Sequence, residues 1–308
     1  MHRRRTVARL ISTVAALAVA AVGVVIISVV ATPDPGHAAA VARPYELTLG
    51  DSYSIGYQPG LGGTPGYSNY IGRRLKMQVA NFGCGGATTS SLLHSVGCGD
   101  PASQDAVAYP GTTQEQAALA FIAAHPARVA LVTVSIGGND FDGCSTAPCV
   151  QAAMPTMGTN IISLLGSLRT ALTNASDGPT PIIGLTYPDV DLGLYVFPTD
   201  PATAASVASA QQSVLAFDDL INPTLSQAYH SVTGAGFVDV TSAPYRSATL
   251  GDDTPLTTTQ YSPPYGRVPA AVAEVCQLTW FCAQGNIHAT TKGYNFIGAL
   301  VVARYRSL

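Results

Sequence analysis

Four segments of the chain carry residue types that together can perform acyl transfer. A serine hydroxyl becomes a nucleophile when a nearby base accepts its proton, and histidine is the usual base. The oxyanion that forms on the attacked carbonyl needs hydrogen-bond donors, such as backbone N–H groups or an asparagine amide. In chain order, the four segments are Gly50-Asp51-Ser52, a glycine-rich stretch around Gly86, Gly138-Asn139-Asp140, and His288.

Each of these segments has a predicted role. We expect Ser52 to be the nucleophile and His288 to be its general base. The backbone N–H of Gly86, the side-chain amide of Asn139 and the Ser52 N–H are the expected oxyanion donors, and one such donor typically lowers the barrier by about 3–4 kcal/mol. A helix cap or a turn glycine would explain each residue singly. The four together favour catalysis, and the neighbouring aspartates are expected to be structural.

The elements that must position these residues alternate between apolar strands and helices. Arg128 to Ile136 is β-branched and almost continuously apolar, which is typical of a buried parallel strand. Further strands are expected at 46–49, 78–82, 181–186 and 236–240, and helices at 67–76, 114–124, 155–175, on both sides of Pro223 within 202–230, and at 290–306. This alternation predicts one α/β domain over residues 44–308, a three-layer α/β/α sandwich with a central parallel sheet. Reactive groups of such a sheet lie on loops at the carboxyl ends of its strands.

The same segments, in this order, resemble the blocks of the SGNH or GDSL hydrolase family. Ser52, Gly86, Asn139 and His288 stand at the positions of that family's serine, glycine, asparagine and histidine. The stretches 81–88 and 186–188 resemble its second block and its fourth-strand segment, so the resemblance covers roughly residues 45–305. It implies a flavodoxin-like sheet and an activity among the esterases, lipases, phospholipases and sugar deacetylases.

One position departs from the pattern of that family. Members usually carry an aspartate three residues before the histidine, and this chain has Gly285 there. Some exported actinobacterial members resemble this chain and use a main-chain carbonyl instead. By that resemblance, the carbonyl of Gly285 or Asn286 accepts a hydrogen bond from His288 Nδ1. An acid from another loop is the alternative, with Asp189, Asp191 and Asp200 as the candidates.

Six cysteines fall into three neighbouring pairs along the sequence and favour disulfides in an exported protein. Short loop closure predicts the pairs Cys84 with Cys98, Cys144 with Cys149, and Cys276 with Cys282. The family resemblance implies that the last pair steadies the histidine loop. A zinc site is the rival interpretation, but the C-x-x-C spacing of zinc sites is absent. No metal or other cofactor is expected.

The first 43 residues predict an export leader. Three arginines, at positions 3 to 5, come before an uncharged stretch over residues 10–31, which as a helix would be roughly 33 Å long and could span a bilayer. Ala38 to Ala40 fits a small-residue cleavage site. The leader is therefore either a cleaved signal peptide or an uncleaved anchor through residues 10–31. In both cases residues 44–308 lie outside the cytoplasm, secreted or on the cell envelope.

The leading functional hypothesis is a cofactor-free serine esterase or lipase that cleaves carboxylic esters of a small molecule, a lipid or an acylated sugar. A carbohydrate O-deacetylase and a non-catalytic envelope protein of the same fold are the alternatives. The net charge of −3 argues against nucleic acid as a partner, because such binding depends on clustered Lys and Arg. The stretch Tyr261 to Tyr265 either lines an acyl or aryl pocket or forms an ordered Pro-rich loop.

Overall fold

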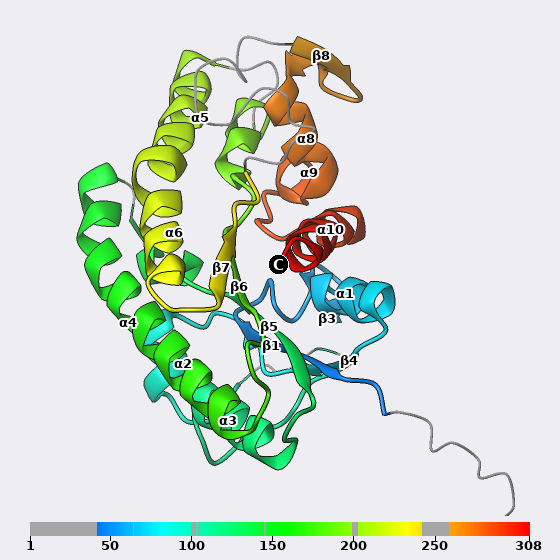
Figure 1. Ribbon diagram of the computed structural model, residues 1–308. Helices are drawn as coiled ribbons and strands as arrows, with labels where there is room; N and C mark the ends of the chain where they lie inside the picture. The colour runs from blue at the N-terminus through cyan, green and yellow to red at the C-terminus, as the bar shows by residue number, and fades with distance from the viewer. Residues whose placement is uncertain are drawn as a thin grey trace, which may run out of the picture. The chain divides into compact units, whose positions relative to one another are not determined.

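A parallel sheet at the centre of the molecule brings distant segments to one edge (Figure 1). The computed structural model describes residues 42–63, 65–99, 103, 105–144, 146–198, 203–241 and 259–308. Five strands pair in the order β4-β1-β5-β6-β7, and every pair is parallel. They are β1 (Tyr45–Gly50), β4 (Gln78–Asn81), β5 (Val129–Ser135), β6 (Ile182–Leu185) and β7 (Ala235–Val238). The predicted α/β class with a central parallel sheet is confirmed.

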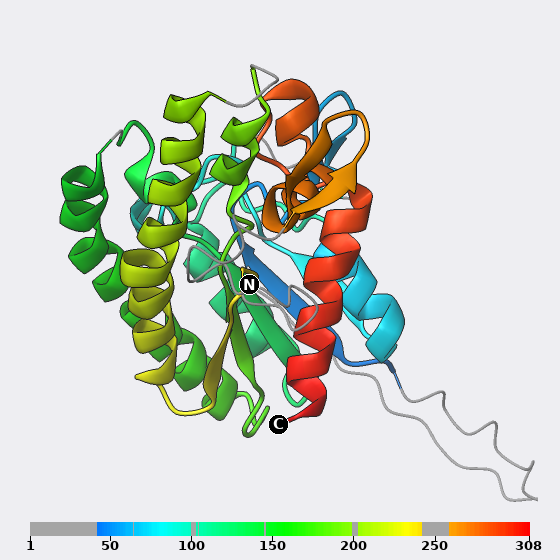
Figure 2. The ribbon, with the colours of Figure 1, turned by 90° about the horizontal axis from the view of Figure 1, so that it is seen from above.

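Helices cover both faces of this sheet, as its apolar strands require. Successive residues of a strand point to opposite faces. Accordingly Leu49 and Val134 belong to the apolar cluster on one face, and Leu131 and Ile183 to the cluster on the other. Helices α2, α3, α4 and α6 contribute to the first cluster, and α1 and α10 to the second. Figures 1 and 2 show helices on both sides of the sheet. Their bounds are α1 (Tyr67–Leu75), α2 (Thr89–His94), α3 (Gln114–Ala124), α4 (Ala147–Asn174), α6 (Asn222–His230) and α10 (Thr291–Arg306).

A third apolar cluster joins elements that follow β6 and β7 in the chain. Its buried members include Leu192, Val214 and Val272. The elements concerned are the 3-10 helix η2 (Val190–Tyr195), α5 (Ala204–Ala216), β9 (Gly266–Pro269), α8 (Ala270–Leu278) and α9 (Phe281–Gln284). Strand β8 (Thr259–Ser262) pairs antiparallel with β9. Tyr261 on β8 is 71% exposed, which favours the ordered-loop interpretation of this Tyr-rich stretch.

Two helical segments differ from their predicted bounds. Helix α4 was predicted to begin at Pro155, but it begins eight residues earlier, at Ala147. Pro148 occupies the first turn, where a proline is tolerated, and Pro155 lies inside the helix. The chain from Ala204 to His230 is helical without a break: α5 runs into a π turn, η3 (Phe217–Ile221), and then into α6. Pro223 lies in the first turn of α6, where a proline is tolerated. It therefore does not interrupt the helical segment, contrary to the prediction.

All three predicted disulfides are present: Cys84–Cys98, Cys144–Cys149 and Cys276–Cys282. Disulfides of this kind persist in oxidising compartments, so they indicate an extracytoplasmic protein. No helix in the described ranges is long and apolar enough to cross a membrane. The predicted leader, including the stretch 10–31, lies outside the described residues.

Candidate active site

The predicted site residues lie on loops at the carboxyl edge of the sheet. Ser52 follows β1, Gly86 follows β4, and Asn139 lies in the 3-10 helix η1 (Gly138–Phe141) after β5. His288 comes from the other end of the chain, three residues before α10 begins. The fold therefore gathers at one edge four residues that span most of the described sequence.

The turn that carries Ser52 depends on a glycine at the end of β1. Gly50 has a φ of +134°, and a Cβ on it would lie 1.9 Å from the carbonyl oxygen of Ser135 on β5. Any side chain would push the two central strands apart at this point. The glycine lets the chain leave β1 sharply, so that Ser52 stands at the strand end and remains partly exposed.

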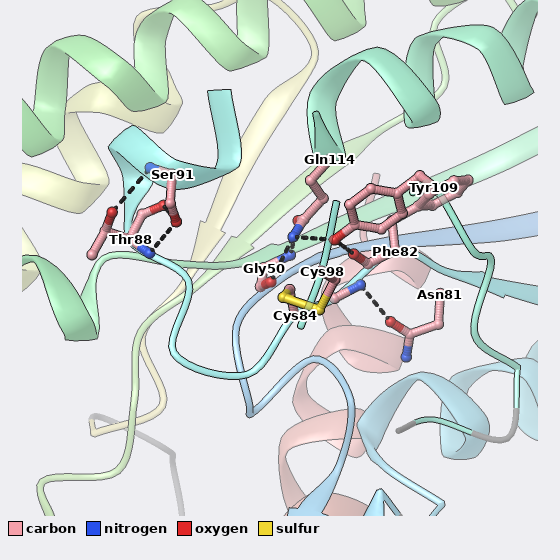
Figure 3. The surroundings of a disulfide bond; sticks show 10 residues. Gly50, Asn81, Phe82, Cys84, Thr88, Ser91, Cys98, Tyr109 and Gln114 are labelled. Carbon is pink, nitrogen blue, oxygen red and sulfur yellow. Dashed lines mark hydrogen bonds between the residues drawn. A yellow bond between two sulfur atoms is a disulfide. The ribbon is translucent and has the colours of Figure 1, made fainter. Parts of the chain in front are cut away.

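The Gln114 side chain of α3 and the backbone of the loop after β4 hold this glycine in place (Figure 3). Gln114 Oε1 accepts from the Gly50 N–H at 2.7 Å, and Gln114 Nε2 donates to the Gly50 carbonyl at 3.0 Å. The Cys84 N–H donates to the same carbonyl at 2.9 Å, and the Cys84–Cys98 disulfide cross-links the loop that leads to Gly86. The nucleophile turn and the glycine-rich loop thus share a common support. No sequence motif marks Gln114 for this role.

A buried tyrosine links the Ser52 turn to the Asn139 loop. The Tyr187 hydroxyl, which comes two residues after β6, donates to Asp51 Oδ2 and accepts from the Gly138 N–H at 3.2 Å. Asp51 Oδ1 accepts from the Tyr53 N–H at 2.9 Å. Burial raises the pKa of Asp51 to about 7, although its hydrogen bond from Tyr187 opposes that rise. Asp51 is therefore structural, as predicted.

Ser52 and His288 are in direct hydrogen-bond contact. His288 Nε2 lies 2.8 Å from Ser52 Oγ, and His288 Nδ1 lies 2.8 Å from Asn286 Oδ1. The same Oδ1 accepts from the backbone N–H of His288 at 3.0 Å. Because a backbone N–H can only donate, the amide atom that faces it must be the oxygen. His288 Nδ1 therefore carries the proton, and the Nε2 lone pair accepts from the Ser52 hydroxyl.

The partner of His288 Nδ1 corrects the prediction made from sequence. A main-chain carbonyl of Gly285 or Asn286 was expected, or else an aspartate, but the acceptor is the side chain of Asn286. The physical reason is an Asx turn, in which an asparagine oxygen accepts from the N–H two residues ahead. The spacing Asn-x-His in the sequence was the available signal.

The aspartates considered as alternatives occupy other places. Asp189 is fully buried and accepts a hydrogen bond from Ser213 of α5. Asp191 lines a groove beside η2. Asp200 lies outside the described residues.

Aromatic rings surround the imidazole. The Tyr53 ring stacks at 5.8 Å between centroids, and the Tyr57 ring lies at 4.5 Å. The Tyr53 hydroxyl donates to the carbonyl of Ile287 at 2.5 Å, so the residue after Ser52 holds the residue before His288. Burial lowers the pKa of His288 to about 4. The imidazole is consequently neutral near pH 7, which is the state that a general base requires.

The two predicted oxyanion residues lie on loops that contact each other. Asn139 Nδ2 donates to the carbonyl of Ala87 at 2.8 Å, and the amide has a second N–H to offer. Gly86 is exposed with a φ of +72°, and a Cβ on it would meet no atom within 4 Å. Asp140 accepts from the Thr89 N–H at 2.8 Å and from its hydroxyl, which ties η1 to α2. Gly86 therefore faces open space, and its loop is hydrogen-bonded to Asn139 through the Ala87 carbonyl.

A groove of about 810 Å³ opens beside η2, between the start of α4 and α5. Its lining combines apolar side chains with two carboxyl groups. Cys144, at one side of the groove, comes five residues after Asn139. The lining includes Val150, Leu194, Leu220, Asp191 and Asp219. Among the described residues, no group of three or more His, Cys, Asp or Glu side chains is placed to hold a metal ion.

Comparison with known families and structures gives the following similarities. A model of the GDSL-like lipase/acylhydrolase family matches residues 48–296. No curated protein matched in the sequence search.

Several solved structures are similar to this chain at low identity. A lipase from a goat rumen metagenome is 14% identical with a TM-score of 0.48, over 84% of this chain and 96% of that one. An acetyl xylan esterase from Geobacillus stearothermophilus is 17% identical with a TM-score of 0.39, over 86% and 95%. A G-D-S-L family lipolytic protein from Veillonella parvula is 12% identical with a TM-score of 0.35, over 86% and 99%.

Proposed function

Because the chain belongs to the GDSL-like lipase/acylhydrolase family, we propose that it is a serine esterase that hydrolyses carboxylic esters. Ser52 is the nucleophile and His288 is the general base. The observation that carries this proposal is the 2.8 Å contact between Ser52 Oγ and His288 Nε2, with the Nδ1–H tautomer fixed by Asn286.

The geometry supports a two-step reaction. Ser52 Oγ attacks the ester carbonyl carbon while its proton passes to His288 Nε2. The carbonyl oxygen becomes an oxyanion, which the Gly86 N–H, the Asn139 amide and the Ser52 N–H stabilise. His288 then gives its proton to the leaving alcohol oxygen, and the C–O bond of the ester breaks. Water attacks the acyl-serine in the same way and releases the acid and free Ser52.

The groove beside η2 supports a finer proposal, that it receives the acyl portion of the substrate. Its lining includes Cys144, which follows Asn139 in the chain, and Asp191 and Leu194, which follow Tyr187. Its volume falls within the range of small-molecule sites. Leu194→Trp should fill part of it and shift the chain-length optimum toward acetate. Leu308→Trp, at the exposed C-terminal residue, is the matched control and should leave the optimum unchanged.

The first test is hydrolysis of p-nitrophenyl esters from acetate to palmitate by the full chain with its disulfides formed. Ser52→Ala should lower kcat by several orders of magnitude, as loss of the nucleophilic serine does in a serine protease, where the fall is about 10⁶-fold, while leaving the folded state intact by circular dichroism. A fluorophosphonate should label Ser52 and no other serine. Undiminished turnover by Ser52→Ala would overturn the proposed mechanism.

We also propose that residues 1–43 form an export leader, either cleaved near Ala38 to Ala40 or retained as an anchor through residues 10–31. The three disulfides support export. The mass of the mature protein from a secreting host distinguishes the two forms. A full-length protein found in the cytoplasm with reduced cysteines would contradict both.

A further inference from the structure

We propose that Asn286 is the residue that positions His288, and that this site works with a neutral amide in place of the acid of a Ser-His-Asp triad. The inference rests on the proposed function and deepens it, since it concerns the third member of the same site. Asn286 hydrogen-bonds to the ring nitrogen remote from Ser52. Its role is therefore to orient the base rather than to take part in the proton transfer.

An asparagine at this place ordinarily fails for a specific reason. When asparagine replaces the aspartate of a serine protease triad, kcat drops about 10⁴-fold because the imidazole adopts the wrong tautomer. An amide has an oxygen at one end and an NH₂ at the other, and an NH₂ facing Nδ1 would force the proton onto Nε2. A neutral positioning residue is therefore effective only when its oxygen is held toward Nδ1.

The histidine loop of this chain supplies that constraint. The His288 N–H donates to Asn286 Oδ1 at 3.0 Å, which fixes the oxygen toward the ring as well as toward the backbone. Gly285, with a φ of +65°, ends α9 and starts the turn. A Cβ on Gly285 would lie 2.6 Å from the Phe197 ring, so the turn is packed against a neighbouring loop.

The backbone on both sides of the ring is held independently of Asn286. The Trp280 N–H donates to the His288 carbonyl at 2.9 Å, and the Tyr53 hydroxyl donates to the Ile287 carbonyl. With the main chain fixed, the direction of the His288 N–H is fixed as well. The amide orientation of Asn286, and hence the tautomer of His288, follows from the fold of the loop.

Among the described residues, the groups in contact with the His288 ring carry no charge. Within the described residues, the ring nitrogens hydrogen-bond to Ser52 and Asn286, and the neighbouring rings are those of Tyr53 and Tyr57. The carboxyl group beside Ser52, that of Asp51, instead accepts from the Tyr53 N–H and the Tyr187 hydroxyl. The imidazolium that forms during catalysis is therefore stabilised by the amide dipole rather than by a carboxylate. A site of this kind keeps its base unprotonated at lower pH than an acid-containing triad, because a nearby carboxylate favours the charged ring.

Asn286→Asp tests the proposal with an isosteric change. The added carboxylate should raise the pH at which His288 titrates by at least about one unit, measured from its imidazole resonances by NMR and from the acid limb of kcat/KM. Asn286→Ala should lower kcat about tenfold or more with little change in KM, because the ring loses its fixed tautomer. Asn174→Ala, at the exposed C-terminal end of α4, is the control and should match the unmodified chain.

The NMR measurement does not depend on turnover, so the two proposals fail separately. An Nε2–H tautomer in the unmodified chain, or an unchanged His288 titration in Asn286→Asp, would overturn the role of Asn286 even if ester hydrolysis is confirmed. Persistent activity in Ser52→Ala would overturn the proposed function. If Asn286→Ala unfolds, the isosteric Asn286→Asp still decides the question.

Discussion

The two halves of the site are supported in different ways. Ser52 and Asn139 follow strands of the buried sheet, and contacts from residues remote in sequence fix them: Gln114 clamps Gly50, and Tyr187 joins Asp51 to Gly138. His288 lies on a loop that an Asx turn and the Cys276–Cys282 disulfide hold locally, and the Tyr53 hydroxyl is its hydrogen-bond contact from the nucleophile side. The nucleophile side is therefore supported mainly by residues remote in sequence, whereas the base side relies more on residues near it in the chain.

Gly50→Ala should have the largest effect, because it attacks the nucleophile side at its tightest point. A Cβ 1.9 Å from a backbone oxygen cannot be relieved without moving β1 or β5. We expect a loss of about 4 kcal/mol or more in the free energy of unfolding, or failure to fold. Denaturant unfolding measures it. Gly86→Ala is the control: its Cβ meets open space, so only its positive φ should cost about 1–2 kcal/mol. Equal losses would contradict the comparison.

Removal of single disulfides should separate the halves by their effect on activity. By loop closure, replacing Cys84 and Cys98 with alanine should cost roughly 3 kcal/mol and replacing Cys276 and Cys282 roughly 2 kcal/mol. We expect the variant without Cys276–Cys282, which loses less stability, to show the larger fall in kcat, because fewer remote contacts hold the histidine loop. Unfolding and p-nitrophenyl ester hydrolysis, both in mild conditions, check the two effects. A larger fall in kcat for the Cys84–Cys98 variant would reverse the interpretation.

Tyr187→Phe should loosen the link between the Ser52 turn and the Asn139 loop. It leaves the Asp51 carboxyl and the Gly138 N–H without their shared partner, at a cost of about 1–3 kcal/mol. The rate should fall through kcat more than through KM. Tyr229→Phe removes a buried hydroxyl whose hydrogen bond is 3.5 Å long, and it should change stability by less than about 1 kcal/mol. Similar losses of stability in both variants would show that Tyr187 contributes only as a buried core residue.

Glu46→Gln, on β1, should give the smallest change in stability, and it concerns the nucleophile side alone. Glu46 Oε1 accepts from Thr48 and Thr133, Oε2 has no hydrogen-bond partner in the described residues, and burial raises the pKa of this carboxyl to about 7. The folded state holds the proton between about pH 4.5 and 7, so stability falls as pH rises through that range. The variant should lose this slope and gain about 1 kcal/mol at alkaline pH. Thermal unfolding on the acid and alkaline sides of that range tests it, and an unchanged slope would contradict it.

The pH dependence of activity concerns the base side. With burial lowering the pKa of His288 to about 4, the free base persists through mildly acidic conditions, and kcat/KM should decline only as pH falls toward about 4. In the unfolded chain His288 has the ordinary histidine pKa of about 6.5, so the unfolded state binds the proton more readily than the folded state. This group therefore destabilises the fold as the pH falls from about 6.5 toward 4. A kcat/KM profile that halves near the ordinary histidine pKa would show that the imidazole is not protected in this way.

The parallel sheet and the site positions could be predicted from sequence because both have local signals. The apolar run 128–136 marks a buried strand, and short motifs mark Ser52, Gly86, Asn139 and His288. The disulfides followed from spacing alone. Family membership and the sheet confirm the class of the fold and of the activity, whereas the roles of the four residues stay predictions for the experiments above.

The supporting residues could not be predicted because their roles come from long-range packing. Gln114 lies 64 residues from Gly50, and Tyr187 lies 136 residues from Asp51, so no local pattern indicates either contact. Asn286 is different: an asparagine two residues before a histidine is a recognisable Asx-turn signal. The family resemblance implied the main-chain carbonyl of Gly285 or Asn286 as the acceptor, and the structure has the Asn286 side chain in that role.

The short span of every disulfide has a consequence for how the protein matures. The paired cysteines lie 14, 5 and 6 residues apart. In a chain threaded across a membrane from its N-terminus, each second cysteine emerges soon after its partner, and long before the next pair follows. An oxidant that acts on the emerging chain then meets one new pair at a time, so correct pairing is the kinetically favoured result. If the chain is exported as proposed, its maturation depends on the oxidation of neighbouring cysteines more than on the reshuffling of wrong pairs.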